Sequence, residues 1–369
     1  MRNPLALGDK LQRAFQYARQ QVARIVETYP DFFPMYTVEG RWQHQGEAWT
    51  HWCEGFLCGQ MWLIYQRTRD PEWRFKAEHY CRLMEHRKSD RSVHDLGFLF
   101  WPSWKRWYDV SGDQPVNEVV VEAGRTLALR FQSQGGYLCS FVALNSVFID
   151  IMMNVGLVYY AAEQTGDDRL RRIADQHCLT TRRYLVRGDG STAQEGIFDP
   201  QTSRFARHNT RQGWRSDSCW ARGQAWALHG FAQAYEFTDD LRFLETAQQC
   251  AEYFIAQSPE HGVPPNDFDE ADPPQPYDSS AAAVAADGLL DLAELSEDAT
   301  RAARYRERAL RILDTLTEIE FMAIEKPYWE GILQHAVYHR PKGLGVDESV
   351  MWGDYYFLQA VLKAMRRGV

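Results

Sequence analysis

A repeated pair of helices is the main pattern of hydrophobic and polar positions along the chain. The first helix of each pair is apolar on all sides, a short turn ending in Asp follows, and the second helix is amphipathic. In the turns, Gly or a polar residue ends one helix, and Asp caps the free N–H groups of the next. The apolar helices are expected at residues 52–67, 96–110, 148–164, 220–237, 279–295 and 350–365. The turns between the helices of a pair are at residues 68–70, 111–113, 165–167, 238–239 and 296–298.

The amphipathic helices indicate how the pairs are arranged. In one of them Trp73, Ala77, Tyr80 and Met84 recur at spacings of three or four residues, which is typical of a helix with one buried face. Their apolar partners must then be buried on every side. About twelve helices, six inner and six outer, fit two concentric rings. The pattern therefore predicts an all-α (α/α)6 toroid, a barrel of six helical hairpins that forms a single domain over residues 1–369.

The composition adds one unusual feature, the aromatic content. Hydrophobic residues make up 45% of the chain and charged residues 25%, as in ordinary folded proteins. The 13 Trp, 18 Tyr and 19 Phe amount to 14% of the chain. Aromatic rings fill large cores, and Trp also offers flat platforms for sugar rings. The formal net charge of −9 argues against nucleic acid or an anionic membrane surface as the main partner.

The cysteines and the apolar stretches bear on location. Seven Cys without a C-x-x-C pair favour a reducing compartment. The N-terminal segment has no sustained apolar run of the kind that marks a signal peptide. The apolar stretch 147–162 is shorter than the roughly 20 residues that a membrane span needs, and it contains Asp150 and Asn154. We therefore expect a cytoplasmic protein, or one whose leader is missing from this chain, with no membrane partner.

Two acidic residues are candidates for chemistry because they precede or open inner helices. The N-terminal ends of the inner helices of a toroid gather at one mouth. Asp150 is expected near the start of a buried helix with Asn154 one turn later on the same face, and a buried carboxylate must titrate or find partners. Asp95 opens another inner helix. Each carboxylate alone could simply stabilise a helix N-terminus, but two at one mouth fit acid–base chemistry on a sugar.

A dense run of polar and aromatic residues leads into the fourth inner helix. Trp220, Arg222, Gln224 and Trp226 are expected near the mouth, after the segment 208–219. Arg can hold a carboxylate through two parallel hydrogen bonds, and Trp can stack on a sugar. The alternative is a Trp-rich helix that packs into the core. Four cations are candidates for outer contacts to a substrate: Arg211, Arg215, Arg340 and Lys342.

Signals for metal or nucleotide binding are weak. His335 and His339 have i,i+4 spacing but no acidic third ligand, so a solvated basic loop at 339–342 is favoured over a zinc site. The acidic residues between 267 and 272 do not match a calcium loop. The chain contains no P-loop, no dinucleotide-binding glycine motif and no nucleophile elbow.

Several motifs together resemble the unsaturated glucuronyl hydrolases of glycoside hydrolase family 88. They are His94-Asp95-Leu96-Gly97-Phe98, Ile149-Asp150-Ile151-Met152-Met153-Asn154, the Trp220–Trp226 run preceded by His208 and Gln212, the Asp278–Ala283 segment and the Gly345–Tyr355 segment. They occur in order over nearly the whole chain. The resemblance implies an (α/α)6 barrel with no metal and no organic cofactor.

The resemblance also implies a reaction and roles for residues. The expected substrate is a di- or oligosaccharide whose non-reducing end is a 4,5-unsaturated uronic acid, as polysaccharide lyases produce. Asp150 would donate a proton to C4 and then act as base for water, while Asp95 would hold sugar hydroxyls and support the developing charge. The remaining residues expected to shape the substrate site are His208, Gln212, Trp220, Arg222, Gln224 and Trp226.

Three substrate-contacting positions depart from the family pattern. Gln194 stands where relatives often have His, Phe141 stands where Trp is usual, and the segment after Trp52 lacks a second Trp. These departures leave the parent polysaccharide open. Alternatives are an unsaturated rhamnogalacturonyl hydrolase of a related barrel family and a non-catalytic toroid that binds an oligosaccharide. A sugar epimerase would need two His bases at the mouth, where only His208 is convincing. The oligomeric state is also open.

Overall fold

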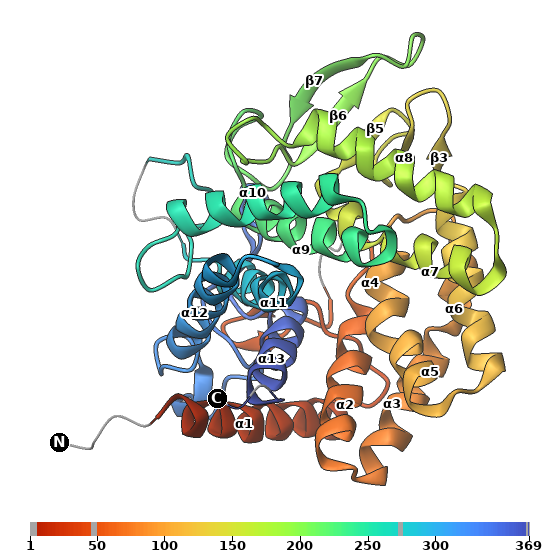
Figure 1. Cartoon of the computed structure of the whole chain (residues 1–369). Coiled ribbons are helices and arrows are strands. Elements are labelled where there is room, and N and C mark those ends of the chain that lie inside the picture. Colours follow the sequence, from red (N-terminus) through yellow and green to blue (C-terminus); the bar gives the residue numbers. More distant parts are fainter. Residues whose placement is uncertain (1–5, 46–49, 272–275, 367, 369) are drawn as a thin grey trace.

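Six inner helical elements form a closed ring in the computed structural model, which describes residues 6–45, 50–271, 276–366 and 368. Each inner element contacts the next, and the last contacts the first, so the expected (α/α)6 toroid is confirmed (Figure 1). The inner elements are α2 (Glu54–Thr68), α4 (Leu96–Phe100) continued by α5 (Arg106–Ser111), α7 (Gly156–Thr165), α9 (Ala221–Thr238), α11 (Ser279–Leu295) and α13 (Met351–Arg366). Every residue of α4 is buried, and most residues of the longer inner helices are also buried, as their apolar sequences require.

Six outer helices surround this ring, and each packs against it with one apolar face. They are α1 (Leu7–Thr28), α3 (Pro71–Leu83), α6 (Gln114–Ala128), α8 (Asp168–Leu185), α10 (Leu241–Gln257) and α12 (Ala299–Leu316). The carboxylates of Asp70, Asp167 and Asp298 accept hydrogen bonds from the first turns of α3, α8 and α12, which confirms the expected capping there. At α10 the cap is Asp240 and not the expected Asp239, which ends α9 in the left-handed conformation. Asp113 makes no such bond at the start of α6.

Short antiparallel strands lie in the segments that connect the helices. The two-stranded pairs are β1 (Thr37–Val38) with β2 (Arg41–Trp42), β3 (Phe131–Gln132) with β4 (Tyr137–Leu138), and β8 (Ala336–His339) with β9 (Leu344–Glu348). A three-stranded sheet has the order β5 (Ser146–Phe148), β6 (Glu195–Phe198), β7 (Phe205–Asn209). None of the described helices is long and apolar enough to cross a membrane.

Two inner helices differ from the sequence-based expectation. The segment 148–164 is not one helix: Phe148 ends β5, Ile149–Met153 forms a 3-10 helix, and α7 begins only at Gly156. The start of this apolar run pairs with β6 as strand β5, and the Ile149 N–H extends the pairing by donating to the Gln194 carbonyl at 2.9 Å. The segment 96–110 contains a π-helical stretch, Trp101–Lys105, because Pro102 has no N–H for the regular ladder.

Aromatic side chains fill the axis of the ring. Phe98 lies 5.1 Å from Trp226 and 5.5 Å from Phe56, and Tyr356 lies 5.5 Å from Trp226, measured between ring centroids. These four residues, which we call the axial aromatic cluster, come from α2, α4, α9 and α13. They tie four inner helices together at the centre of the toroid.

A charged network joins α9, α11 and α13 on the far side of this cluster from the mouth. The Lys363 Nζ atom lies 2.8 Å from an oxygen of Asp287 and 2.7 Å from both oxygens of Asp291. The Nε2 atom of His229 lies 2.8 Å from the other oxygen of Asp287. Asp287 is fully buried, and Lys363 and His229 lower its pKa despite that burial. The two carboxylates therefore depend on Lys363 for compensation.

The substitution Lys363→Met should lower the free energy of unfolding by about 3–5 kcal/mol, because it leaves a buried carboxylate without its ammonium partner. Guanidinium chloride unfolding at neutral pH measures this change. The matched control is Lys76→Met, which removes the surface pair with Glu72 and should cost less than about 1 kcal/mol. Equal effects of the two substitutions would contradict a compensating role for Lys363.

Candidate active site

A narrow pocket lies at the mouth formed by the segments that precede or open the inner helices. It brings together Asp95 and Asp150, the two carboxyl groups singled out by sequence. Eight of the eleven expected site residues line it. The full lining is Thr50, Trp52, His94, Asp95, Phe98, Phe141, Phe148, Asp150, Gln212, Trp220, Arg222, Trp226 and Tyr338.

The side-chain amide of Asn154 connects the two segments that carry the carboxyl groups. Its Nδ2 atom donates to the backbone carbonyl of Asp150 at 3.0 Å, and its Oδ1 atom accepts the N–H of Phe98 at 2.9 Å. A Cβ atom at Gly97 would lie 2.4 Å from the Asn154 Cα atom, so only Gly permits this approach. The expected relation between Asp150 and Asn154 thus holds, although the segment is a 3-10 helix.

The two carboxyl groups differ in their protonation. Burial raises the pKa of Asp150 to about 6, while the positive charge of Arg222 opposes this rise. Burial raises the pKa of Asp95 to about 8, and the negative charge of Asp150 adds to it. The Oδ1 atom of Asp150 is inaccessible and has no hydrogen-bond partner among the described residues. At neutral pH Asp95 therefore keeps its proton, whereas Asp150 can exchange one.

A buried, neutral His94 lies beside Asp95. The Nδ1 atom of His94 accepts the backbone N–H of Phe141 at 3.0 Å, so the ring proton is on Nε2, which lies 3.3 Å from the Oδ1 atom of Asp95. Complete burial holds the pKa of His94 well below its usual range, so the ring is neutral. His94 therefore places a neutral ring beside Asp95 and adds no charge there.

Arg222 is anchored more tightly than its expected role requires. Its guanidinium donates to the carbonyl groups of Val337 and Tyr338 and to Asp278, and it stacks over the rings of Trp220 and Trp352. These three bonds use three of the five N–H donors of the group, and its Nε has no partner among the described residues. A substrate carboxylate can use only the remaining donors.

Three expected site residues do not line the pocket. His208 lies on β7, where its Nε2 atom is 2.7 Å from the Tyr184 carbonyl and its ring packs on Phe205. Gln224 is buried in α9, and its amide donates to the carbonyl groups of Gly190 and Cys250. Both side chains are committed to holding neighbouring segments, so the expectation that they contact substrate is corrected.

Gln194 is also behind the pocket wall. Its Oε1 atom accepts three hydrogen bonds, from the Thr210 hydroxyl at 2.7 Å and from the N–H groups of Arg211 and Gln212 at 2.7 and 3.0 Å. Its Nε2 atom donates to the Gln212 Oε1 atom at 2.8 Å, and Gln212 in turn donates to the Tyr338 carbonyl at 3.0 Å. Gln194 thus positions Gln212, which does line the pocket.

Five lining residues were not on the expected list: Thr50, His94, Phe98, Phe148 and Tyr338. His94 and Phe98 belong to the motif that contains Asp95, and Phe148 lies two residues before Asp150, so their neighbourhood was a signal. Thr50 and Tyr338 line the pocket because the fold brings them there, and no sequence motif pointed to them.

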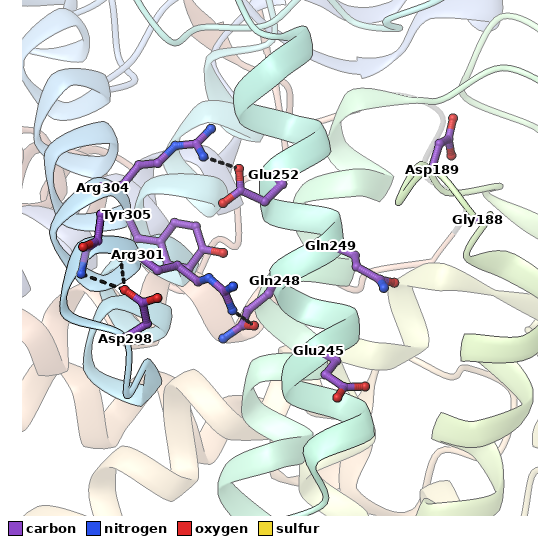
Figure 2. A pocket seen from close by; sticks show the side chains of 11 residues that line it. Gly188, Asp189, Glu245, Gln248, Gln249, Glu252, Asp298, Arg301, Arg304 and Tyr305 are labelled. Atoms are coloured by element: carbon purple, nitrogen blue, oxygen red, sulfur yellow. Dashed lines mark hydrogen bonds and ion pairs between the residues drawn. The ribbon is translucent and has the colours of Figure 1, made fainter.

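The pocket is small in this conformation. Its free volume is about 20 Å³, which is room for one water molecule. A sugar ring needs many times more space, so a ligand has to displace lining side chains. A larger hollow of about 790 Å³ is an open groove between α10 and α12, crossed by the ion pair of Arg304 and Glu252 (Figure 2). It contains none of the expected site residues, so its size alone does not make it the active site.

The His residues that suggested a metal have other partners. The Nδ1 atom of His335 lies 2.5 Å from Asp347, and His339 is buried in β8. Among the described residues, His229, Asp287 and Asp291 form the one cluster with spacing suited to a metal ion. The ammonium group of Lys363 already lies between its two carboxylates, so it supplies the positive charge there.

The structure is thus an all-α toroid of helical hairpins with two carboxyl groups of raised pKa at its mouth. Residues 23–290 match the family model described as Glycosyl Hydrolase Family 88. The chain belongs to this family and is a glycoside hydrolase, as expected from its motifs.

Individual relatives cover nearly the whole chain. It is 33% identical to the unsaturated glucuronyl hydrolase of Bacillus sp. (strain GL1), over 97% of both chains. It is 32% identical to an unsaturated chondroitin disaccharide hydrolase of Streptococcus agalactiae, over 85% of this chain and 81% of the relative. The crystal structure of the Bacillus sp. GL1 enzyme superposes with a TM-score of 0.91 over 97% of both chains, at 32% identity. A Streptococcus agalactiae unsaturated glucuronyl hydrolase mutant complexed with dGlcA-GalNAc6S superposes with a TM-score of 0.84, at 29% identity, over 98% of this chain and 93% of that one.

The substitution Gln194→Ala should lower the free energy of unfolding by about 1–3 kcal/mol, because it leaves buried N–H and hydroxyl donors without their acceptor. It should also raise KM more than it lowers kcat, since Gln212 loses its support while the carboxyl groups keep theirs. Urea unfolding and steady-state kinetics measure the two effects. Gln201→Ala, on the exposed turn between β6 and β7, is the control and should change neither. A stable Gln194→Ala enzyme with unchanged KM would contradict the positioning role.

Proposed function

We propose that this protein removes a 4,5-unsaturated uronic acid from the non-reducing end of oligosaccharides made by polysaccharide lyases. The observation that carries the proposal is the half-buried carboxyl of Asp150, which has one unpartnered oxygen, a pKa near 6 and a second carboxyl group in the same pocket. The names of the relatives, unsaturated glucuronyl and unsaturated chondroitin disaccharide hydrolases, support the substrate class.

The reaction consumes one water molecule. The C4=C5 double bond of the sugar is a vinyl ether, so a proton from Asp150 adds to C4 and leaves positive charge shared by C5 and the ring oxygen. Water then forms a bond to C5 and returns a proton to Asp150. The resulting hemiketal opens by breaking the bond between C5 and the ring oxygen, which gives a ketone. The acyclic hemiacetal at C1 finally releases the neighbouring sugar as an alcohol and becomes an aldehyde.

The pKa values favour Asp150 as the group that both gives and takes the proton. A general acid–base group works best when its pKa is close to the working pH, and Asp150 meets this condition. Asp95 stays protonated near neutral pH, so it can donate a hydrogen bond to a sugar hydroxyl. It would carry a charge to support the transition state only above about pH 8.

Aromatic and cationic groups would hold the unsaturated ring. Trp52, Trp220 and Trp226 line the pocket together with Phe141, which provides apolar surface for a sugar face. Arg222 is the positive charge that opposes the rise in the pKa of Asp150. Its unused N–H donors suit the carboxylate of the substrate.

We also propose that the whole chain acts as one catalytic domain in a reducing, cytoplasmic setting. All seven cysteines are buried and free, which is typical of such a compartment. One assay distinguishes a hydrolase from a toroid that only binds an oligosaccharide. An enzyme abolishes the ultraviolet absorbance of the conjugated double bond of an unsaturated disaccharide, whereas a binding protein leaves it unchanged.

The substitution Asp150→Asn should lower kcat about 10³-fold, the contribution of a positioned acid–base group, and leave the melting temperature close to that of the parent. Loss of absorbance with an unsaturated disaccharide measures the rate, and thermal unfolding measures the fold. Asp109→Asn is the matched control, since it changes an exposed Asp paired with Lys105. A rate for Asp150→Asn above about a tenth of the parent rate would remove Asp150 from the acid–base role.

The pH dependence follows from the protonation state that the first step needs. The acid must carry its proton, and burial raises the pKa of Asp150 to about 6. As the pH rises through this value the protonated fraction falls, so kcat/KM should decline about tenfold per pH unit on the alkaline side. Initial rates from pH 4 to 9, with substrate well below KM, test this. A constant kcat/KM up to pH 8 would argue against a carboxyl group as proton donor.

A further inference from the structure

The place of the Asp150 carboxyl depends on the backbone that carries it. Its Oδ1 atom has no hydrogen-bond partner among the described residues. The carrier is the five-residue 3-10 helix Ile149–Met153, and such helices have poorer hydrogen-bond geometry than α-helices. Neighbouring segments therefore have to hold this short helix in position.

Two of these neighbours are β6 and α9. The Ile149 N–H donates to the Gln194 carbonyl at 2.9 Å, directly before β6. A Cβ atom at Gly230 of α9 would lie 2.7 Å from the carbonyl carbon of Met152, so the backbones of α9 and the short helix are in contact. Neither of these two contacts involves α4, the helix that follows Asp95.

Asn154 supplies a link to α4. It directly follows the short helix, and its side chain is fully buried. The Nδ2 atom donates to the Asp150 carbonyl at 3.0 Å, and the Oδ1 atom accepts the Phe98 N–H at 2.9 Å. Phe98 lies in the first turn of α4, three residues after Asp95. One side-chain amide therefore joins the backbone of Asp150 to the helical turn that Asp95 opens.

This link affects the geometry of the candidate acid–base group. Without the amide, the Phe98 N–H and the Asp150 carbonyl would each lose a hydrogen-bond partner, and the two segments would shift to find others. A displacement of about 1 Å at a reacting group can lower a rate about 10²-fold. A small movement of the backbone here would thus change the place of Asp150 relative to Asp95 and to a bound sugar.

We propose that Asn154 is a positioning residue that fixes the carboxyl group of Asp150 relative to Asp95. The inference rests on the proposed function and assigns to it a residue that does not line the pocket. An amide that only stabilised the fold would change the melting temperature and leave the rate of the folded enzyme unchanged.

The first variant, Asn154→Ala, removes both hydrogen bonds of the side chain. The value of kcat should fall about 10²-fold because the acid is displaced, and KM should stay within about threefold because the pocket lining is intact. Loss of absorbance with an unsaturated disaccharide at pH 5 measures both constants, and thermal unfolding confirms the fold.

The second variant, Asn154→Asp, is a conservative replacement that restores the link at low pH. Burial favours the protonated form of the introduced carboxyl at pH 5. Its O–H can then donate to the Asp150 carbonyl while its other oxygen accepts the Phe98 N–H. The value of kcat at pH 5 should therefore be within about fivefold of that of the parent.

Asn117→Ala is the matched control for the loss of a buried amide. Asn117 is 7% exposed and joins α6 to α7, where its Nδ2 atom donates to Gln164 at 2.8 Å and its Oδ1 atom accepts the Tyr160 hydroxyl at 2.5 Å. This variant also loses two hydrogen bonds, so its melting temperature should fall. Its kcat should stay within about twofold of the parent value, because Asn117 is remote from the segments of Asp95 and Asp150.

The outcomes separate this inference from the proposed function. A folded Asn154→Ala enzyme with kcat within threefold of the parent, a loss carried mainly by KM, or an Asn154→Asp enzyme as slow as Asn154→Ala at pH 5 overturns the inference alone. If Asn154→Ala does not fold, Asn154→Ser takes its place. Its hydroxyl is too short to reach both partners, so kcat should fall at least about tenfold, and an unchanged kcat overturns the inference. A parent protein that leaves the absorbance unchanged overturns the proposed function and this inference with it.

Discussion

The architecture depends on filling the axis of the toroid. Six inner helices in a ring leave a central column that no backbone enters, and an empty column would forfeit the packing on which core stability rests. The axial aromatic cluster, Phe56, Phe98, Trp226 and Tyr356, occupies that column with large rings from four helices. It serves as the floor of the pocket on one side, because Phe98 and Trp226 also line it.

Buried carboxyl groups have different surroundings on the two sides of the axial aromatic cluster. On the side away from the pocket, the ammonium group of Lys363 and the imidazole of His229 contact Asp287, and its pKa falls. On the side of the pocket, Asp95 is buried and Asp150 is half-buried with one oxygen unpartnered among the described residues, and burial raises the pKa of both. A buried carboxylate with opposite charges beside it stays ionised, whereas one without them can exchange a proton near neutral pH. The same fold therefore holds a compensated, charged carboxylate at one end of the ring and carboxyl groups of raised pKa at the other.

The ring of hairpins was predictable because helical periodicity and Asp caps are local signals, and both carboxyl groups could be found because they interrupt apolar segments. What the sequence could not show depends on pairing between distant strands. The apolar run before Asp150 fits a helix equally well until β6 pairs with it. The register of β6 and β7 then places Gln194 behind Gln212 and turns His208 toward Tyr184. No local pattern encodes either placement.

Recognition of an anionic sugar by an acidic protein has to act at short range. The net charge of −9 does not attract the substrate from a distance, and salt screens fields beyond about 8 Å in any case. The cations at the mouth are mostly engaged by protein groups: Arg222 by Asp278 and two carbonyls, and Arg211 by Glu195. Binding energy must then come from a few remaining N–H donors and from aromatic surface. Such a site distinguishes ligands by shape and hydrogen bonding at contact, since the charges that would reward an extra anionic group are already paired.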